Sequence, residues 1–408
     1  MKRKIYYGLA VYDNKEIKAV NNVLKNKKLT LIDGPSVKKF EEEVAKLFGK
    51  KYALMVNSGS SANLLALASL KLDKGSEIIT PTLTFSTTVA PIYQLGLIPN
   101  FVDVEINKFI VNVEKIEKSI NKKTKVIIVP NLLGNIPNYK KIMNIAKKHS
   151  LIVIEDSADT IGYSVNGKNF GKFTDITTTS FYASHIVTGA GFGGMVCFND
   201  KKLYAEAKLL RGWGRSSATF NESEDIKKRF SAKVSGIQYD GKYIFLRMGY
   251  NFLPSEISAA FGLEQLKKIE KNIDTRVRNF KYLTNFFSKF NNLINLPITN
   301  LNARTGWLAF PLTIKENKKF NRKDMQIFFE KNNIQTRTIF TGNILRQPAI
   351  NNLKYKSKKD SAIISNDVMK NGILLGCHHG MNVKDLDYIC KTFIKFLKFK
   401  RVNLYNYT

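Results

Sequence analysis

Cysteine is scarce in this sequence: Cys197, Cys377 and Cys390 are the three present in 408 residues. Their number is odd and they lie far apart. No CxxC pair occurs, and no cysteine lies at a zinc-like spacing from a histidine. We therefore expect neither a disulfide framework nor a bound metal.

Long hydrophobic runs are also missing. No uninterrupted apolar run approaches the roughly 18 residues that a membrane-spanning helix requires. The basic residues 2–4 precede an apolar stretch over residues 5–12, which ends at Asp13 and offers no clear cleavage site for export. We expect a cytoplasmic protein without integral membrane association.

Acidic residues are few. There are 33 Asp and Glu against 65 Lys and Arg, which gives a formal net charge of +32. Such an excess favours an anionic partner, but the lysines are spread over the whole length instead of being clustered, so we expect no nucleic-acid partner. A small polyanionic substrate fits the charge equally well. With 44% apolar and 11% aromatic residues, the chain can form one large or two medium cores, which excludes a disordered or fibrous protein.

Apolar strands alternate with helical segments along the first half of the chain, which is typical of an α/β domain with a mostly parallel sheet. The expected strands are Tyr52–Val56, Glu77–Thr80, Asn100–Val104, Lys125–Val129, Leu151–Glu155, Thr177–Phe181 and Met195–Phe198. The expected helices are Ser61–Leu70, Thr88–Leu95, Asn138–Lys148 and Lys202–Arg211.

The second half has a less regular pattern. Apolar residues at intervals of three and four from Leu266 to Phe287 predict one long amphipathic helix. Shorter strands are expected around Trp307–Ile314 and Thr336–Phe340. We therefore expect a large domain over residues 1–265 and a smaller C-terminal α+β domain over residues 266–408, entered by the long helix.

Candidate chemistry lies at the ends of the expected strands, where open α/β folds bind their ligands. Residues 57–64, Asn-Ser-Gly-Ser-Ser-Ala-Asn-Leu, form either a phosphate-binding turn or an ordinary serine-capped helix. Asp156 ends the fifth strand and either caps a helix or faces a cationic heterocycle nitrogen. Gly189 to Gly194 fit GxGxxG, but a strand follows instead of a helix, which excludes a dinucleotide fingerprint.

In this order the motifs resemble the DegT/DnrJ/EryC1/StrS family, pyridoxal-phosphate-dependent sugar-modifying enzymes of aminotransferase fold type I. The resemblance covers residues from about 29 to about 390. It implies a three-layer α/β/α fold with a seven-stranded sheet, and Gly59, Ser60 and Ser180 at the cofactor phosphate. It implies Phe85 stacked on the pyridine ring and Asp156 paired with the ring nitrogen, which would keep the ring protonated and able to accept an electron pair.

Asn251, in the segment Gly249-Tyr250-Asn251, resembles the family's asparagine that reaches the phosphate of the neighbouring subunit. The resemblance therefore implies a homodimer with shared active sites. Arg215, Arg337, Asn343 and Arg346 lie in or near segments that flank the active site in related enzymes, and we expect them to bind substrate. Arg337 and Arg346 suit a diphosphate or a glutamate carboxylate, because a guanidinium binds such groups in bidentate fashion.

One departure from the family pattern is informative. Where aminotransferases have the lysine that binds the cofactor covalently, this sequence has His185, five residues after Ser180. An imidazole cannot form that bond, but it can act as general base and acid, with an ordinary pKa near neutrality. Lysine to histidine here marks the nucleotide-sugar 3-dehydratases of the family. Asp159, where the aminotransferases usually have Gln, points the same way and is expected at the cofactor.

The resemblance thus implies pyridoxal 5'-phosphate and pyridoxamine 5'-phosphate as cofactors, and removal of the C3 hydroxyl from a nucleotide-linked 4-keto-6-deoxyhexose. The product would be a 3,6-dideoxy sugar, usually destined for lipopolysaccharide or another surface glycan. Some relatives use an iron–sulfur cluster, but residues 216–230 contain no cysteine and three cysteines cannot supply four ligands. We therefore expect recycling of the cofactor by L-glutamate.

Two other functions stay open on the sequence alone: a C4 aminotransferase of nucleotide sugars, and a catalytically inactive sugar-nucleotide-binding homologue. The nucleotide, whether CDP, GDP, dTDP or UDP, stays open as well.

Overall fold

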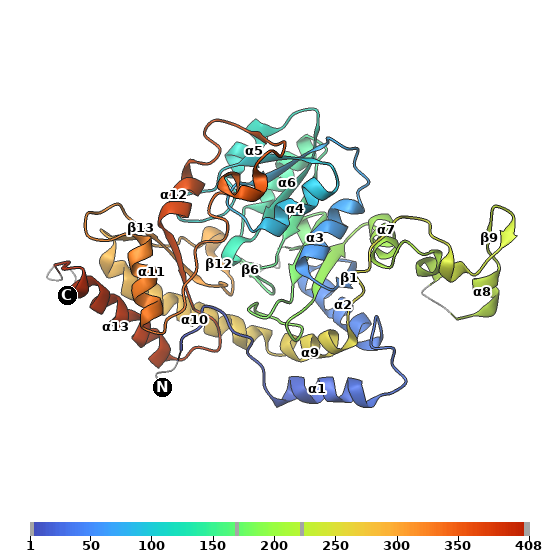
Figure 1. The fold of residues 1–408 in the computed structure, drawn as a ribbon, viewed down its shortest axis with the longest axis horizontal. Coiled ribbons are helices and arrows are strands. Elements are labelled where there is room, and N and C mark those ends of the chain that lie inside the picture. Colours follow the sequence, from blue (N-terminus) through green and yellow to red (C-terminus); the bar gives the residue numbers. More distant parts are fainter. Residues whose placement is uncertain (1–3, 168–170, 221–223, 404–408) are drawn as a thin grey trace.

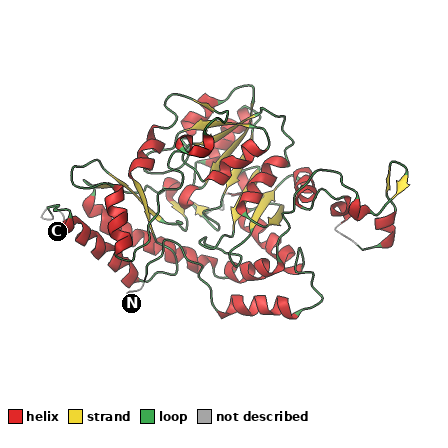
Figure 2. Cartoon of the chain, in the orientation of Figure 1, coloured by secondary structure: helices red, strands yellow, loops and turns green. Residues whose placement is uncertain are grey.

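A large central sheet lies between two layers of helices in the computed structural model, which describes residues 4–167, 171–220 and 224–403 (Figures 1 and 2). Lys2 and Arg3 of the basic N-terminal stretch lie outside these ranges. Within them, the sheet has eight strands in the order β1-β8-β7-β5-β4-β2-β3-β14. Their bounds are β1 Tyr52–Val56, β2 Glu77–Pro81, β3 Ile98–Val102, β4 Thr124–Pro130, β5 Ile152–Asp156, β7 Ile176–Ser180, β8 Gly194–Phe198 and β14 Lys356–Ser357.

The sheet is mostly parallel, as expected. The exception is β8, which runs antiparallel to both β1 and β7. The seven expected strands all form, but the expected count of seven is corrected by β14, which pairs with Asn100 and Phe101 of β3. Two exposed polar residues have no hydrophobic periodicity, so the sequence pattern could not indicate this strand.

The strand β4 shows why helices cover both faces. Val126 and Ile128 belong to one hydrophobic core, and Ile127 and Val129 belong to the other. Because alternate side chains of a strand point to opposite faces, such a run must be buried on both sides. The first face is covered by α3 Gly59–Ala68, α4 Ser86–Gln94 and α7 Lys201–Arg211. The second is covered by α2 Pro35–Phe48, α5 Val113–Ser119, α6 Tyr139–Lys148 and α9 Glu256–Leu266.

An N-terminal helix, α1 Asn14–Lys25, precedes this core and packs on α9. It begins with a capping box. The Asp13 side chain accepts a hydrogen bond from the backbone N–H of Glu16, and the Glu16 side chain accepts one from the backbone N–H of Asp13. The buried Glu16 carboxylate also accepts from Gln265 Nε2 at 2.6 Å and from Lys268 Nζ at 2.7 Å. This helix was not among those expected from the sequence, although Asp and Glu three positions apart are a helix-start signal.

A second, smaller antiparallel sheet follows in the order β11-β13-β15. Its strands are β11 Ile294–Asn295, β13 Phe310–Ile314 and β15 Gly372–Leu375. The helices packed with it are α10 Ile269–Phe287, α11 Arg322–Lys331, α12 Ile363–Asn371 and α13 Val383–Phe399.

The long helix expected from the sequence is α10. Residues 336–340 form one bridge, between Arg337 and Leu374, instead of the expected strand, because the chain turns at Phe340 with φ 42°. The domain division at residue 265 stays a prediction. A further short pair joins β6 Ser164–Val165 to β12 Ala303–Arg304.

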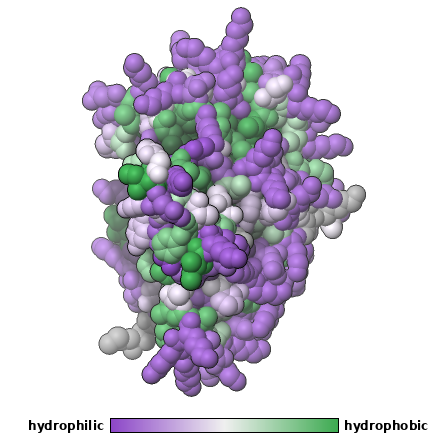
Figure 3. Space-filling model, turned by 90° about the vertical axis from the view of Figure 1, so that its right-hand side faces the viewer, coloured by the Kyte–Doolittle hydropathy of each residue, from purple (hydrophilic) through white to green (hydrophobic). Residues whose placement is uncertain are grey.

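Residues 224–250, here called the arm, project away from the central sheet beyond α7 (Figure 1). The arm contains α8 Ile226–Phe230 and the hairpin of β9 Lys233–Val234 and β10 Ile237–Gln238. Its apolar side chains are exposed, and Met248 is exposed to 94%. Figure 3, which views the molecule from the side of the arm, shows hydrophobic side chains gathered among hydrophilic ones over the middle of this face. No helix among the described residues is long and apolar enough to cross a membrane.

Candidate active site

A cavity of about 1090 Å³ opens at the carboxyl ends of the central strands. Pro130, Asp156 and Ser180, the last residues of β4, β5 and β7, line it. The first turns of α3 and α4 form another part of the wall, and residues 337–353 of the C-terminal part close it from the other side. The sheet therefore brings together polar side chains that lie far apart in the sequence, as expected for a parallel sheet.

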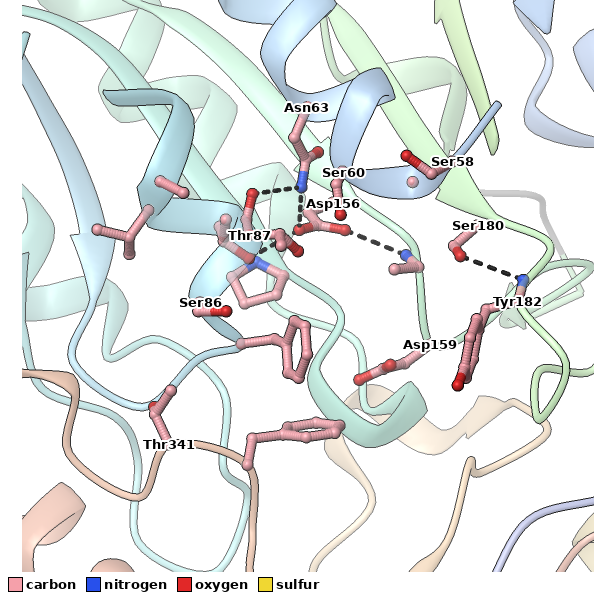
Figure 4. Close-up of a pocket in the computed structure, with 18 of the residues that line it drawn as sticks. Ser58, Ser60, Asn63, Ser86, Thr87, Asp156, Asp159, Ser180, Tyr182 and Thr341 are labelled. Carbon is pink, nitrogen blue, oxygen red and sulfur yellow. Dashed lines mark hydrogen bonds between the residues drawn. The ribbon is translucent and has the colours of Figure 1, made fainter. Parts of the chain in front are cut away.

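The turn before α3 has the geometry and the donors of an anion site. Ser58 caps the helix, and its Oγ accepts from the backbone N–H of Ser61 at 3.1 Å. A Cβ at Gly59 would lie 2.6 Å from the Cβ of Ser180, so only glycine fits where the helix begins against β7. Ser60 and Ser180 face the cavity beside this turn (Figure 4). The free N–H groups of a helix start and two hydroxyls are the donors that a phosphate requires.

Asp156 is a buried carboxylate at the floor of the cavity. Its Oδ2 accepts from Asn63 Nδ2 and Thr88 Oγ1, each at 2.8 Å, and its Oδ1 accepts from the Ala158 N–H at 3.2 Å (Figure 4). Burial raises the pKa of Asp156, and these hydrogen bonds offset only part of the effect. A cation facing Oδ1 would restore the charged form, because an opposite charge stabilises a buried carboxylate.

Phe85 and Asp159 lie between this floor and the opposite wall. Phe85 is 52% exposed at the start of α4, and its ring meets Phe340 edge to face with centroids 5.8 Å apart. About half of the Phe85 side chain is thus open, and it lines the cavity, where a flat ring could stack on it. Asp159 accepts from the Leu133 N–H at 2.7 Å, and burial raises the pKa of Asp159 to about 7.

His185 lies in the cavity wall, in the turn after β7. Its Nδ1 is 3.1 Å from the carbonyl oxygen of Ser180. A carbonyl oxygen only accepts, so Nδ1 carries the proton and Nε2 has a free lone pair. Burial lowers the pKa of His185 to about 4, and the positive charge of Arg276 adds to this effect. The near-neutral value expected from the sequence is therefore too high, and His185 is a neutral base at pH 7.

No lysine is among the described residues that line the cavity. The site therefore offers no primary amine that could bind a carbonyl group covalently. His185 offers a free Nε2 lone pair in this lysine-free lining.

The four residues expected to bind substrate do not lie together in the structure. Arg337 lines the cavity, with its Nη1 donating to the Thr336 carbonyl at 2.7 Å. Arg346 is exposed and donates to Asn366, outside the cavity lining. Asn343 is buried and also donates to Asn366, at 2.8 Å.

Arg215 and Asn251 lie at the base of the arm and not in the cavity wall. The Arg215 guanidinium is 4.1 Å from the centre of the Trp213 ring. Asn251 is exposed, and its backbone forms a bridge with Gly212. The Asn251 side chain therefore does not contribute to the cavity of its own chain.

Three residues at the site were missed by the sequence analysis. Asn63 and Thr88 hold Asp156, and the signal for Asn63 was a polar residue buried in the otherwise apolar helix α3. Tyr7 lines the cavity although it lies 149 positions before Asp156 in the sequence (156 − 7). No local pattern marks it, because the N-terminal segment reaches the site through tertiary contacts alone.

Comparison with known proteins places the chain in a family. The profile of the DegT/DnrJ/EryC1/StrS aminotransferase family matches residues 11–394. The chain belongs to this family. A GDP-4-keto-6-deoxy-D-mannose 3-dehydratase of Escherichia coli O55:H7 is 35% identical over 94% of this chain and 98% of its own. A dTDP-4-dehydro-2,6-dideoxy-D-glucose 3-dehydratase of Saccharopolyspora spinosa is 35% identical over 90% and 82%.

Solved structures agree with this membership. One described as GDP-4-keto-6-deoxymannose-3-dehydratase with a trapped PLP–glutamate geminal diamine superimposes with a TM-score of 0.84 at 31% identity, covering 95% of this chain and 99% of that one. The family and the fold expected from the sequence are thereby confirmed. Within the DegT/DnrJ/EryC1/StrS family, this chain has His185 and no lysine in the described lining of its cavity.

Proposed function

We propose that this chain removes the C3 hydroxyl from a nucleotide-linked 4-keto-6-deoxyhexose, with pyridoxal phosphate in its aldehyde and amine forms as cofactor and L-glutamate as co-substrate. The observation that carries the proposal is His185, a neutral imidazole in a cavity wall that contains no lysine among its described residues. Relatives named 3-dehydratases, at 35% identity over most of both chains, support it.

The residues present fit the cofactor. Asp156 is a buried carboxylate without a cationic partner, and a pyridinium N–H would supply the missing charge. The glycine-tight turn at Gly59, with Ser60 and Ser180, would hold the phosphate. The open face of Phe85 would stack on the ring, and Asp159 would lie at its edge.

The amine form of the cofactor supplies an amino group for the C4 ketone and a ring that accepts an electron pair. His185 would accept at Nε2 the proton given up by the C4′ carbon of the bound cofactor, while the Ser180 carbonyl holds Nδ1–H and keeps the imidazole in one orientation. The imidazolium then carries a proton that it can donate to the departing C3 oxygen, which leaves as water. Asp156 would keep the pyridine nitrogen of the bound cofactor protonated.

Arg337 is our candidate for the anionic part of a substrate, since it is the one of the four expected substrate ligands that lines the cavity. A guanidinium suits both a diphosphate and a glutamate carboxylate. Glutamate as co-substrate is supported by the solved relative that holds a PLP–glutamate adduct. Since relatives are named for GDP and dTDP sugars, the nucleotide is left to experiment.

A homodimer with shared active sites completes the proposal. The arm exposes Ile237, Tyr243, Phe245 and Met248, an amount of apolar surface that a partner subunit would cover. Asn251 at the base of the arm lies outside the cavity of its own chain and is exposed. Both features support an arrangement in which Asn251 serves the phosphate of the other subunit.

The test is the mass of the product. The protein, loaded with pyridoxal phosphate, is incubated with L-glutamate and CDP-, GDP-, dTDP- or UDP-linked 4-keto-6-deoxy sugars. Loss of the C3 oxygen from one of them supports the proposal. A gain of nitrogen at C4 would instead identify an aminotransferase, and binding without a mass change would identify an inactive homologue.

A further inference from the structure

The N-terminal segment of residues 4–12, here called the strap, is fixed to the C-terminal part of the molecule before it reaches α1 (Figure 1). The Ile5 N–H donates to the Asn333 carbonyl, and the Gln335 N–H donates to the Ile5 carbonyl, each at 2.8 Å. The Tyr7 N–H donates to Gln335 Oε1 at 3.0 Å. These backbone bonds hold the strap in one register.

The strap then passes directly over the turn that carries His185. A Cβ at Gly8 would lie 2.7 Å from the Cβ of Ser184, the residue before His185. Such a separation is shorter than any normal carbon contact, so the strap and this turn lie as close together as a glycine permits. The position of Tyr7, one residue before Gly8, is therefore coupled to the position of the catalytic imidazole.

Tyr7 presents a neutral phenol to the cavity. Burial and the nearby Asp159 raise the pKa of Tyr7 well above its usual value, so its hydroxyl stays protonated at every physiological pH. The Arg337 guanidinium lies 5.7 Å from the centre of the Tyr7 ring. The half-buried Tyr7 side chain lines the cavity, and among the described residues no hydrogen bond to its hydroxyl is present, so the hydroxyl is open to a ligand there.

We propose that the Tyr7 hydroxyl binds the sugar of the substrate, on the wall of the cavity formed by the strap, beside the turn that carries His185. The inference rests on the proposed function and adds a substrate-binding residue to it. The element that carries Tyr7 favours a contact with the sugar over a contact with the cofactor. Gly59, Ser180 and Asp156 belong to the sheet and α3, whereas Tyr7 comes from the strap and lies next to Arg337.

A phenol that both donates and accepts suits a sugar hydroxyl. It also adds a contact that a nucleotide without its sugar cannot use. Loss of one such hydrogen bond to a neutral group costs about 0.5–1.5 kcal/mol, and leaving a buried sugar hydroxyl unpaired raises the cost further. We therefore expect removal of the Tyr7 hydroxyl to weaken sugar binding on the order of tenfold.

The experiment compares Tyr7→Phe with Tyr6→Phe in the loaded enzyme. Tyr6 is the matched control, because it is 43% exposed and is not part of the cavity lining. Three quantities are measured: the rate of the glutamate reaction from the change in cofactor absorbance, the turnover of the nucleotide-linked 4-keto sugar, and binding of a nucleotide-linked 6-deoxyhexose by calorimetry. The free nucleotide is titrated in parallel.

Tyr7→Phe is expected to leave the rate of the glutamate reaction and the affinity for free nucleotide within about twofold of wild type. Its affinity for the nucleotide sugar is expected to be about tenfold lower. Tyr6→Phe is expected to match wild type in all of them. If Tyr7→Phe binds and turns over the nucleotide sugar as wild type does, the inference is wrong and the proposed function stands. If the glutamate reaction slows equally, Tyr7 acts on the cofactor and the inference is again wrong.

The two proposals fail in different ways. If the wild-type enzyme dehydrates none of the nucleotide sugars but binds one of them through Tyr7, the proposed reaction falls and the sugar contact stands. If it neither binds nor converts any of them, both proposals are overturned.

Discussion

The imidazole Nδ1 of His185 lies 3.1 Å from the carbonyl oxygen of Ser180. This contact joins the proposed base to the strand that also supplies a hydroxyl of the proposed phosphate site, since Ser180 is the last residue of β7. It fixes the tautomer, and it leaves Nε2 as the proton acceptor. The orientation of the base and the position of the anion site are therefore set by the same residue.

The protonation of His185 gives the first prediction. Burial lowers its pKa to about 4, so the folded protein keeps the imidazole neutral where an ordinary histidine, with a pKa of about 6.5, would be charged. In NMR of the cofactor-free protein, the His185 ring carbon signal should not titrate between about pH 5 and 8. The signal that is missing from the spectrum of His185→Asn is assigned to His185. A titration of that signal near pH 6.5 would contradict the proposed environment.

The same shift predicts how stability depends on pH. Between about pH 6.5 and about pH 4 the unfolded chain binds a proton at residue 185 that the folded chain does not bind. The free energy of unfolding contributed by this residue is therefore fully present above about pH 6.5 and decreases as the pH falls towards 4. Urea unfolding of wild type and His185→Asn over this range should show a smaller decrease in the variant. If the unfolding free energies of wild type and variant decreased in parallel, the lowered pKa of His185 would be contradicted.

Asp156→Asn separates catalysis from folding. In the cofactor-free protein the change removes a carboxylate that burial disfavours, and Asn63 and Thr88 stay close to the new side chain, so the melting temperature should fall little or rise. Turnover should fall by roughly 100- to 5,000-fold, since breaking a buried charge pair costs about 3–5 kcal/mol. Calorimetry and initial rates measure the two effects. A large loss of stability with unchanged turnover would mean that Asp156 is structural.

Gly59→Ala tests the anion site. The new Cβ would lie 2.6 Å from the Ser180 Cβ, so either the start of α3 or the end of β7 must move. We expect pyridoxal phosphate to bind about tenfold more weakly, a loss equal to roughly one hydrogen bond to a charged group. Gly212→Ala is the control, because the nearest atom there is 3.9 Å away. Equal cofactor affinity in both variants would remove Gly59 from the site.

Shared active sites can be tested by mixing two inactive variants, His185→Asn and Asn251→Ala. In a mixed dimer, one site carries both defects and the other carries neither. If subunits pair at random, half of the dimers are mixed and each has one intact site, so activity should recover to about a quarter of wild type. Monomers in solution, or no recovery after exchange, would show that Asn251 does not act on the other subunit.

Much of this arrangement could be predicted from the sequence, for a physical reason. The strands are short apolar runs, and strands buried on both faces place their polar last residues at one edge, so Asp156 was a candidate from its position. The family resemblance supplied its expected role and also Gly59, Ser60, Phe85 and Ser180, which all line the cavity.

The features of the site that the sequence could not indicate depend on contacts between residues far apart in the chain. Tyr7 reaches the site through Gln335, a residue 328 positions away. The low pKa of His185 arises from burial and from Arg276, which the neighbouring sequence does not contain. Arg346 and Asn343 stood in a distinctive segment, yet both side chains contact Asn366 instead of the cavity, because that segment folds back on α12. The local pattern fixed their positions in the chain and not the direction of their side chains.

The central claim is that His185 moves the proton during C3 deoxygenation, and the most direct measurement is the rate of this step in His185→Asn with the cofactor bound. The account predicts that the variant binds pyridoxal phosphate and the nucleotide sugar as wild type does, while formation of the 3-deoxy product falls on the order of 1,000-fold, within the range for a lost general base. Deoxygenation at the wild-type rate in this variant would contradict it.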